Sequence, residues 1–154
     1  MERPSLFIDF EASGIAPDSY PIEVAVVSSE TSFSSLIKPV RYWTHWSFDA
    51  QDMHGLTKDH LLQGGDTPVG VARNMNQLFS GQELCSDSPQ DGFWLDVLYE
   101  AADLMPTFEL KPLEVLVGRE AASDIYRLLP TTRRHRALHD ATALMEACRA
   151  FFED

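Results

Sequence analysis

The chain has 154 residues, of which 44% are hydrophobic, and its formal net charge is −12 at pH 7. This length and apolar content suit one globular domain with a core of its own. The acidic balance argues against a protein that wraps long nucleic acids through phosphate contacts, because that binding mode needs a basic surface. The acids either aid solubility or include metal ligands whose charge bound ions offset.

The sequence also predicts a cellular setting. No apolar run approaches the roughly 20 residues of a membrane span. The N-terminus lacks the basic start and apolar stretch of a signal peptide. The two cysteines, Cys85 and Cys148, are too few for a disulfide framework and have no metal-ligand spacing. We therefore expect a cytoplasmic protein with two buried thiols and no membrane contact.

Local patterns predict strands first and then strands interleaved with helices. In chain order, the predicted elements are strands at 6–11, 22–27 and 32–37, helices at 57–62 and 69–79, a strand at 83–86, a helix from 91, a strand at 108–110, and helices at 120–129 and 137–152. This order indicates an α/β layered fold with a mixed sheet.

The first predicted strand carries two acids on one face. Strand side chains alternate between faces, so Asp9 and Glu11 point to the same side, together with Phe7. The apolar neighbours indicate a central, buried strand, where two like charges are costly unless a cation neutralises them. A divalent cation with oxygen ligands would do so. The alternative is an edge strand with one solvated face, and Phe7 counts against it.

A histidine and a third acid lie near the C-terminus. His135 and Asp140 are five residues apart and would point about 140° apart within one helix. Their side chains converge only if His135 precedes the helix and Asp140 lies in its first turns. In that arrangement, the side chain of His139 points in a different direction from that of His135. Taken alone, His135 is better interpreted as a surface histidine in a polar segment. The adjoining basic residues are either solvated charges or a local phosphate contact: Arg133, Arg134 and Arg136.

A fourth acid is expected where the helix from residue 91 begins. In a helix, the spacing of Asp91, Leu95 and Leu98 places all three on the face that packs against the core. An aspartate at this position could also be an ordinary N-cap. Asp87 and Asp96 are the competing acids. Asp96 ranks last because it lies off the main apolar stripe, whereas Asp87 remains a reserve ligand.

Together these segments resemble the motifs of the DEDD superfamily of 3′–5′ exonucleases, in its histidine-containing (DEDDh) branch. That branch includes the proofreading subunit of bacterial DNA polymerase, ribonuclease T and oligoribonuclease. The matching segments are Asp-Phe-Glu-Ala-Ser-Gly at 9–14, Ile-Glu-Val-Ala at 22–25, Met-His-Gly-Leu-Thr at 53–57, 87–95 around Asp91, and His-Arg-Ala-Leu-His-Asp at 135–140. Asp87 stands where the family often has Asn, and Gln90 where it often has Phe.

The resemblance implies an RNase H-like fold: a mixed central sheet of about five strands flanked by α-helices, in a single exonuclease domain over residues 1–154. It implies two Mg²⁺ or Mn²⁺ ions, and oxygen-only ligands disfavour zinc. The implied metal ligands are Asp9, Glu11, Asp91 and Asp140. The implied catalytic residues are His135, as general base, and Glu11. The implied substrate-binding residues are Ala12, Ser13, Gly14, Ile15 and His54.

The expected function is hydrolysis of phosphodiester bonds at the 3′ end of single-stranded DNA or RNA, with release of nucleoside 5′-monophosphates. The expected partner is such an end or a short oligonucleotide, and the resemblance leaves a homodimer open beside a monomer. One alternative is a hydrolase of dinucleotides or other small phosphodiesters, which the acidic balance favours. Another is a non-catalytic exonuclease-like binding module, against which the complete set of acids counts.

Overall fold

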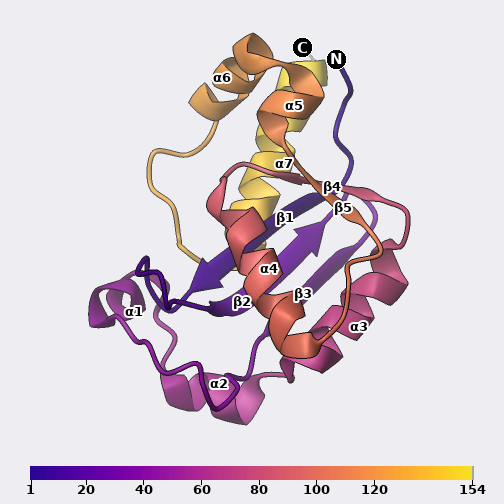
Figure 1. Cartoon of the computed structure of the whole chain (residues 1–154). Coiled ribbons are helices and arrows are strands. Elements are labelled where there is room, and N and C mark those ends of the chain that lie inside the picture. The colour runs from indigo at the N-terminus through magenta and orange to yellow at the C-terminus, as the bar shows by residue number, and fades with distance from the viewer. Residues whose placement is uncertain (154) are drawn as a thin grey trace.

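The computed structural model describes residues 1–153 and contains a mixed sheet with the strand order β3–β2–β1–β4–β5 (Figure 1). The strands are β1 (Phe7–Ala12), β2 (Pro21–Val27), β3 (Ser32–Leu36), β4 (Glu83–Ser86) and β5 (Glu109–Pro112). β1 pairs with β2, and β2 with β3, in antiparallel fashion, whereas β4 is parallel to both β1 and β5. β1 is therefore central, and the predicted α/β class with a mixed sheet is confirmed.

The helices are α1 (Phe48–His54), α2 (Lys58–Gly64), α3 (Pro68–Phe79), α4 (Gln90–Ala102), α5 (Leu113–Val117), α6 (Arg119–Arg127) and α7 (Ala137–Glu153). The five helices predicted from the sequence are confirmed, with shifted ends. Thr57 caps α2 as predicted, accepting a hydrogen bond from the His60 backbone N–H at 3.2 Å. The sequence does not predict α1 and α5, because helices of seven and five residues are too short to display a clear period. α2 is as short as α1, but it was predicted from its N-cap, Thr57.

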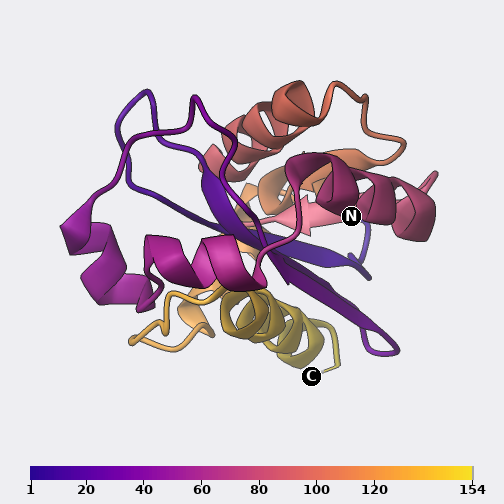
Figure 2. The ribbon, with the colours of Figure 1, turned by 90° about the horizontal axis from the view of Figure 1, so that it is seen from below.

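Helices cover both faces of the sheet (Figure 2). α3 and α4 form one core with Ile8 and Phe10 of β1, whereas α5, α6 and α7 form the other core with Phe7. Alternation along β1 therefore directs Asp9 and Glu11 toward the α7 side. Asp9 is only 6% exposed, so the buried, central position predicted for this strand is confirmed.

The parallel register of β1 and β4 brings a further acid to the centre of the sheet. Phe7 pairs with Cys85, so the same register carried two residues further sets Asp87 beside Asp9. Both strands end at this edge, and the carboxyl ends of parallel strands are where open α/β sheets place their ligand sites. The fold thus gathers polar side chains at the ends of β1 and β4.

α7 begins between His135 and Asp140, as the spacing of these two residues requires if their side chains are to converge. α7 begins at Ala137, so His135 lies before the helix and Asp140 lies in its first turn. His135 adopts a left-handed backbone conformation with φ 56°, which turns the chain sharply before the helix. Within the described residues, no helix combines the length and the apolar character that crossing a membrane requires.

Candidate metal centre

Two groups of three carboxylates meet at Asp9. The first contains Asp9, Glu11 and Asp140, and the second contains Asp9, Asp87 and Asp91. Within each group, one carboxylate oxygen from every residue lies within 4.8 Å of the others. The structure thus brings the four predicted ligands together and adds Asp87, so that Asp87 and Asp91 are neighbours rather than alternatives. We call these groups the first and second triads.

Helix starts contribute two of these acids. Asp91 lies in the first turn of α4 and Asp140 in the first turn of α7, where the helix dipole favours negative charge. Asp91 is not the N-cap, a position that Pro89 occupies, and its Oδ2 accepts a hydrogen bond from Ser86 Oγ at 2.7 Å. Asp96, by contrast, is exposed and belongs to neither triad, as its low rank in the sequence analysis predicts.

The triads concentrate negative charge in a buried place. Burial, followed by the charges of Asp91 and Glu11, holds the pKa of Asp9 well above its ordinary value. Burial and then the neighbouring Asp140 raise the pKa of Glu11 to about 8. Burial is also the main cause that raises the pKa of Asp91 to about 7. These shifts mean that the metal-free cluster holds protons near neutral pH.

The donor atoms fit divalent cations. Every side chain in the two triads offers carboxylate oxygens, the donor type that hard divalent ions prefer. Asp9 Oδ2 is buried and has no hydrogen-bond partner, which is costly for an oxygen that carries charge. A cation shared between the triads would satisfy this oxygen. The carboxylates are therefore arranged so that they can hold metal.

A narrow pocket of about 210 Å³ adjoins Glu11 and contains most of the residues predicted to bind substrate. The pocket is lined by Phe10, Glu11, Ala12, Gly14, Ile15, Ala50, Met53, His54, Gln90, Trp94 and His135. Ile15 is 89% exposed, so its side chain stands free at the rim. Ser13 does not line the pocket: its Oγ is buried, accepts a hydrogen bond from the Tyr20 backbone N–H and lies 3.1 Å from His45 Nδ1.

His54 ends α1 with one ring nitrogen engaged and the other without a partner. Its Nδ1 accepts a hydrogen bond from the Leu56 backbone N–H at 3.0 Å, so the proton of the neutral ring resides on Nε2. Nε2 is buried and has no hydrogen-bond partner among the described residues. Burial lowers the pKa of His54, which favours this neutral form. His54 thus retains an unused donor beside the pocket.

Sequence reasoning missed Glu23, which fixes the start of α7. Glu23 lies directly opposite Glu11 in the β1–β2 register, an unfavourable like-charge pair on its own. Arg136 binds Glu23 through two nitrogens at 2.7–3.2 Å, and the Ala137 backbone N–H donates to Glu23 Oε1 at 2.9 Å. Glu23 therefore ties β2 to the first residue of α7. The signals in the sequence were an acid in an otherwise apolar strand and the resemblance of residues 22–25 to a family segment, and neither indicated Arg136 as its partner.

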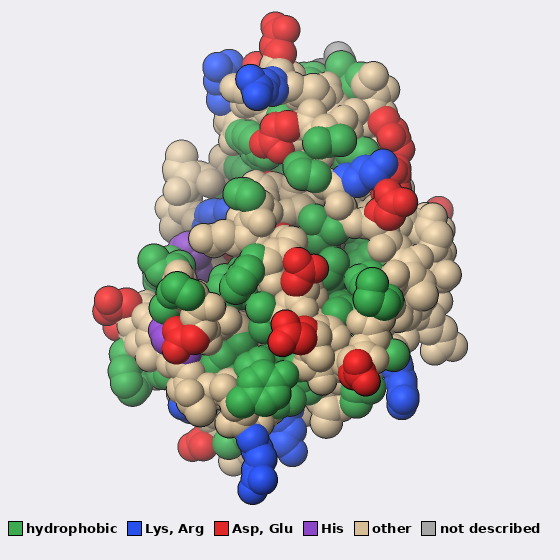
Figure 3. Space-filling model, in the orientation of Figure 1, with side chains coloured by type: hydrophobic (Ala, Val, Ile, Leu, Met, Phe, Trp, Pro, Cys, Tyr) green, Lys and Arg blue, Asp and Glu red, His purple; other side chains and the backbone are tan. Residues whose placement is uncertain are grey.

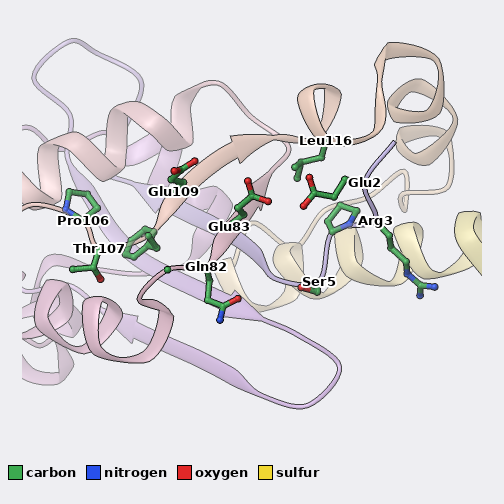
Figure 4. A pocket seen from close by; sticks show the side chains of 12 residues that line it. Glu2, Arg3, Ser5, Gln82, Glu83, Pro106, Thr107, Glu109 and Leu116 are labelled. Carbon is green, nitrogen blue, oxygen red and sulfur yellow. The ribbon is translucent and has the colours of Figure 1, made fainter.

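A larger hollow of about 600 Å³ lies elsewhere, where the N-terminal segment passes β4 and β5 (Figure 4). Glu2, Glu83 and Glu109 line it. These acids lack the features of the triads: Glu2 and Glu109 are exposed, and Glu83 forms an ion pair with Lys111. The site with the chemistry of a metal centre is therefore the smaller one around Asp9.

No protein-family model matches this chain, and no curated protein is significantly similar to it. Solved structures of exonuclease I are similar. Apo exonuclease I has a TM-score of 0.68 at 16% identity, over 96% of this chain and 41% of its own. The zinc-ion form of the E. coli exonuclease I complex with single-stranded DNA has a TM-score of 0.67 at 14% identity, over 99% and 42%. E. coli exonuclease I with a dT13 oligonucleotide has a TM-score of 0.67 at 16% identity, over 96% and 40%.

These likenesses define the fold. The chain has the mixed-sheet α/β architecture of exonuclease I, and the RNase H-like fold expected from the sequence is confirmed. The chain spans about two fifths of the length of these structures. Identities of 14–16% carry no assignment of activity, which depends on the side chains of this chain.

The raised carboxyl pKa values predict that the metal-free protein loses stability as pH rises. Glu11 and Asp91 have folded-state pKa values of about 8 and about 7, above those of the unfolded chain, so folding binds protons that a higher pH removes. In EDTA, we expect the melting temperature to fall by several degrees between about pH 5 and about pH 8, and to level off above the folded-state pKa values of Glu11 and Asp91. Saturating Mn²⁺ should abolish the fall, because the ion stabilises the ionised carboxylates.

Two variants of α4, one test and one matched control, check the origin of this pH dependence. Asp91→Asn removes one of the buried carboxylates and should reduce the pH slope in EDTA. Asp96→Asn makes the same chemical change at an exposed position and should leave the slope at the wild-type value. A wild-type melting temperature that does not change over this pH range would contradict the raised pKa values.

Glu23→Gln should destabilise the protein by about 1–3 kcal/mol, because Arg136 loses its carboxylate partner. Urea unfolding monitored by circular dichroism measures this loss. Glu30→Gln removes the same charge from the exposed β2–β3 turn, and it should change stability by less than about 0.5 kcal/mol. Equal effects of the two variants would show that the Glu23–Arg136 pair does not anchor α7.

Proposed function

We propose that this chain is a metal-dependent 3′–5′ exonuclease that releases nucleoside 5′-monophosphates from the 3′ end of single-stranded DNA or RNA. The observation that carries this proposal is the sharing of Asp9 by two carboxylate triads, beside a pocket bordered by Glu11 and His135. Two adjacent oxygen-rich positions are what a two-metal phosphodiesterase centre requires. The exonuclease fold and the presence of single-stranded DNA in similar structures add support.

In this proposal, Asp9, Glu11, Asp91 and Asp140 hold two Mg²⁺ or Mn²⁺ ions, and Asp87 is available as a fifth carboxylate. When bound, such ions lower the pKa of water and offset the negative charge of a reacting phosphate. The high pKa values of Glu11 and Asp91 then imply that the carboxylates release protons as they take up metal.

His135 is the proposed general base. Its position before α7 lets the imidazole border the pocket while Asp140, one turn into the helix, belongs to the first triad. His135 takes a proton from the attacking water, whose oxygen forms the new bond to phosphorus. The bond from phosphorus to the 3′ oxygen of the preceding nucleotide breaks, and that oxygen receives a proton. The products are a nucleoside 5′-monophosphate and a shortened strand.

The pocket provides the proposed site for the terminal nucleotide. Ala12 and Gly14 contribute the wall next to Glu11, and the free side chain of Ile15 can pack against the terminal base. His54 Nε2 offers its unused donor to an oxygen of the same nucleotide. Ser13 serves this site indirectly, because its buried hydroxyl joins the β1–β2 loop to Tyr20 and His45.

The surface charge favours short or locally held substrates. Acidic side chains are spread over the face seen in Figure 3, with hydrophobic side chains between them, and the whole chain has a net charge of −12. A long polyanion would be repelled by such a surface. Hydrolysis of dinucleotides or other small phosphodiesters is therefore the second candidate function.

The proposed function predicts large losses of activity at two positions. With a labelled single strand and Mg²⁺ or Mn²⁺, His135→Ala should reduce the rate at least about a hundredfold, because the general base is removed. Asp140→Asn should reduce it to near background, because the first triad loses a carboxylate. Asp96→Asn, the exposed control, should retain wild-type activity. Wild-type activity in Asp140→Asn would overturn the site assignment.

A substrate panel separates the candidate functions in the same assay. Single-stranded DNA, single-stranded RNA, duplex and a length series from the dinucleotide upward should each be tested with both metals. An exonuclease produces a ladder of single-nucleotide steps from the 3′ end. Turnover confined to dinucleotides would establish the second candidate, whereas Mn²⁺ binding without turnover of any substrate would indicate a binding module.

A further inference from the structure

Arg133 lies between the two triads. Its terminal nitrogen is 3.5 Å from Asp87 Oδ2 and 3.7 Å from Asp140 Oδ2, so one guanidinium spans an acid of each triad. Among the ion pairs formed by residues 1–153, this is the only cationic side chain paired with the triads. Arg133 is thus the internal counter-cation of the metal-free cluster.

The contacts of Arg133 differ in kind from those of Arg136. Arg136 binds Glu23 through two nitrogens at hydrogen-bonding distance, which is the strong geometry of an arginine–carboxylate pair. Arg133 reaches both of its acids through a single nitrogen and at longer distances. Long contacts through one nitrogen are weaker than a pair formed through two nitrogens. Arg136 is therefore a structural anchor, whereas Arg133 can leave its partners without disturbing the fold.

The surroundings give Arg133 room to move. Together with Arg134, His139 and Asp140, it lines a hollow of about 210 Å³ beside the first triad. The guanidinium can turn away from the acids into this hollow and still remain at the edge of the metal centre. Two other lining residues, Arg134 and His139, can donate hydrogen bonds to an anion in the hollow.

We propose that Arg133 is an exchangeable cation that neutralises Asp87 and Asp140 in the metal-free protein and binds a substrate phosphate once these carboxylates hold divalent ions. The inference rests on the proposed function, because a phosphodiester supplies the anion that the freed guanidinium binds. A carboxylate that neutralises a divalent ion no longer attracts arginine, and the two cations repel each other. Phosphate offers the paired acceptors that a guanidinium matches.

The exchange predicts opposite effects of Arg133→Gln on two affinities. Calorimetry with Mn²⁺ alone should show roughly three- to fivefold tighter binding than in the wild type, because a competing cation is gone. Calorimetry with deoxythymidine 5′-monophosphate at saturating Mn²⁺ should show about tenfold weaker binding, because a charged donor is lost. Arg119→Gln, an equal charge change at an exposed residue of α6, should alter neither affinity.

Asp87→Asn tests whether Arg133 acts through its acid partner. In an Asp87→Asn background, Arg133→Gln should increase Mn²⁺ affinity less than in the wild type, because one of the two exchanged contacts is already absent. Circular dichroism on all variants confirms that each is folded. An unchanged or weaker Mn²⁺ affinity in Arg133→Gln overturns the exchange, and so does an unchanged nucleotide affinity.

The outcomes for Arg133 and for the proposed function can be told apart. A wild-type protein that fails to bind Mn²⁺ overturns both. Mn²⁺ binding that Arg133→Gln leaves unchanged overturns the exchange alone. Opposite shifts in the two affinities, without strand cleavage by the wild type, support the exchange and overturn the exonuclease.

Discussion

Burial of like charges at Asp9 is the constraint around which this structure is organised. The residue lies in the middle of the central strand, almost without solvent, and four other carboxylates converge on it in two triads. An isolated buried carboxylate is costly, and a cluster of them more so. The metal-free protein reduces the cost by retaining protons and by drawing in Arg133. Divalent ions would remove this cost, which would couple the stability of the protein to metal uptake.

The surrounding elements hold this unfavourable arrangement in position. α7 and α4 both begin at the cluster, so their amide ends face the acids that they carry. Glu23 and Arg136 join β2 to α7 and keep the first triad together, while Ser86 at the end of β4 steadies Asp91. The carboxylates are therefore held by strand ends and helix starts rather than by long loops, which suits the proposed centre, in which two ions and a phosphate must be aligned.

Several parts of this arrangement were predictable from local sequence. Alternation along the first strand was enough to place Asp9 and Glu11 on one face, and the spacing of His135 and Asp140 was enough to require a helix start between them. Non-local contacts were not accessible in this way. Asp87 becomes a neighbour of Asp9 only through the parallel register of β1 and β4, and Glu23 meets Arg136 across the gap between β2 and α7. A single sequence specifies periodicity and capping but leaves strand register open.

Gly14 illustrates how one position can constrain two parts of a site. A β-carbon there would lie 2.4 Å from His45 Cε1 and 3.1 Å from the β-carbon of Ser47. His45 approaches this closely because it lies within hydrogen-bonding distance of Ser13 and Ser19, and Ser47 caps α1. Any larger residue would have to displace the His45 side chain and crowd Ser47, the residue that caps α1. The loop that follows β1 thus also influences the width of the pocket, so the pocket could be reshaped from the α1 side while the carboxylates stay unchanged.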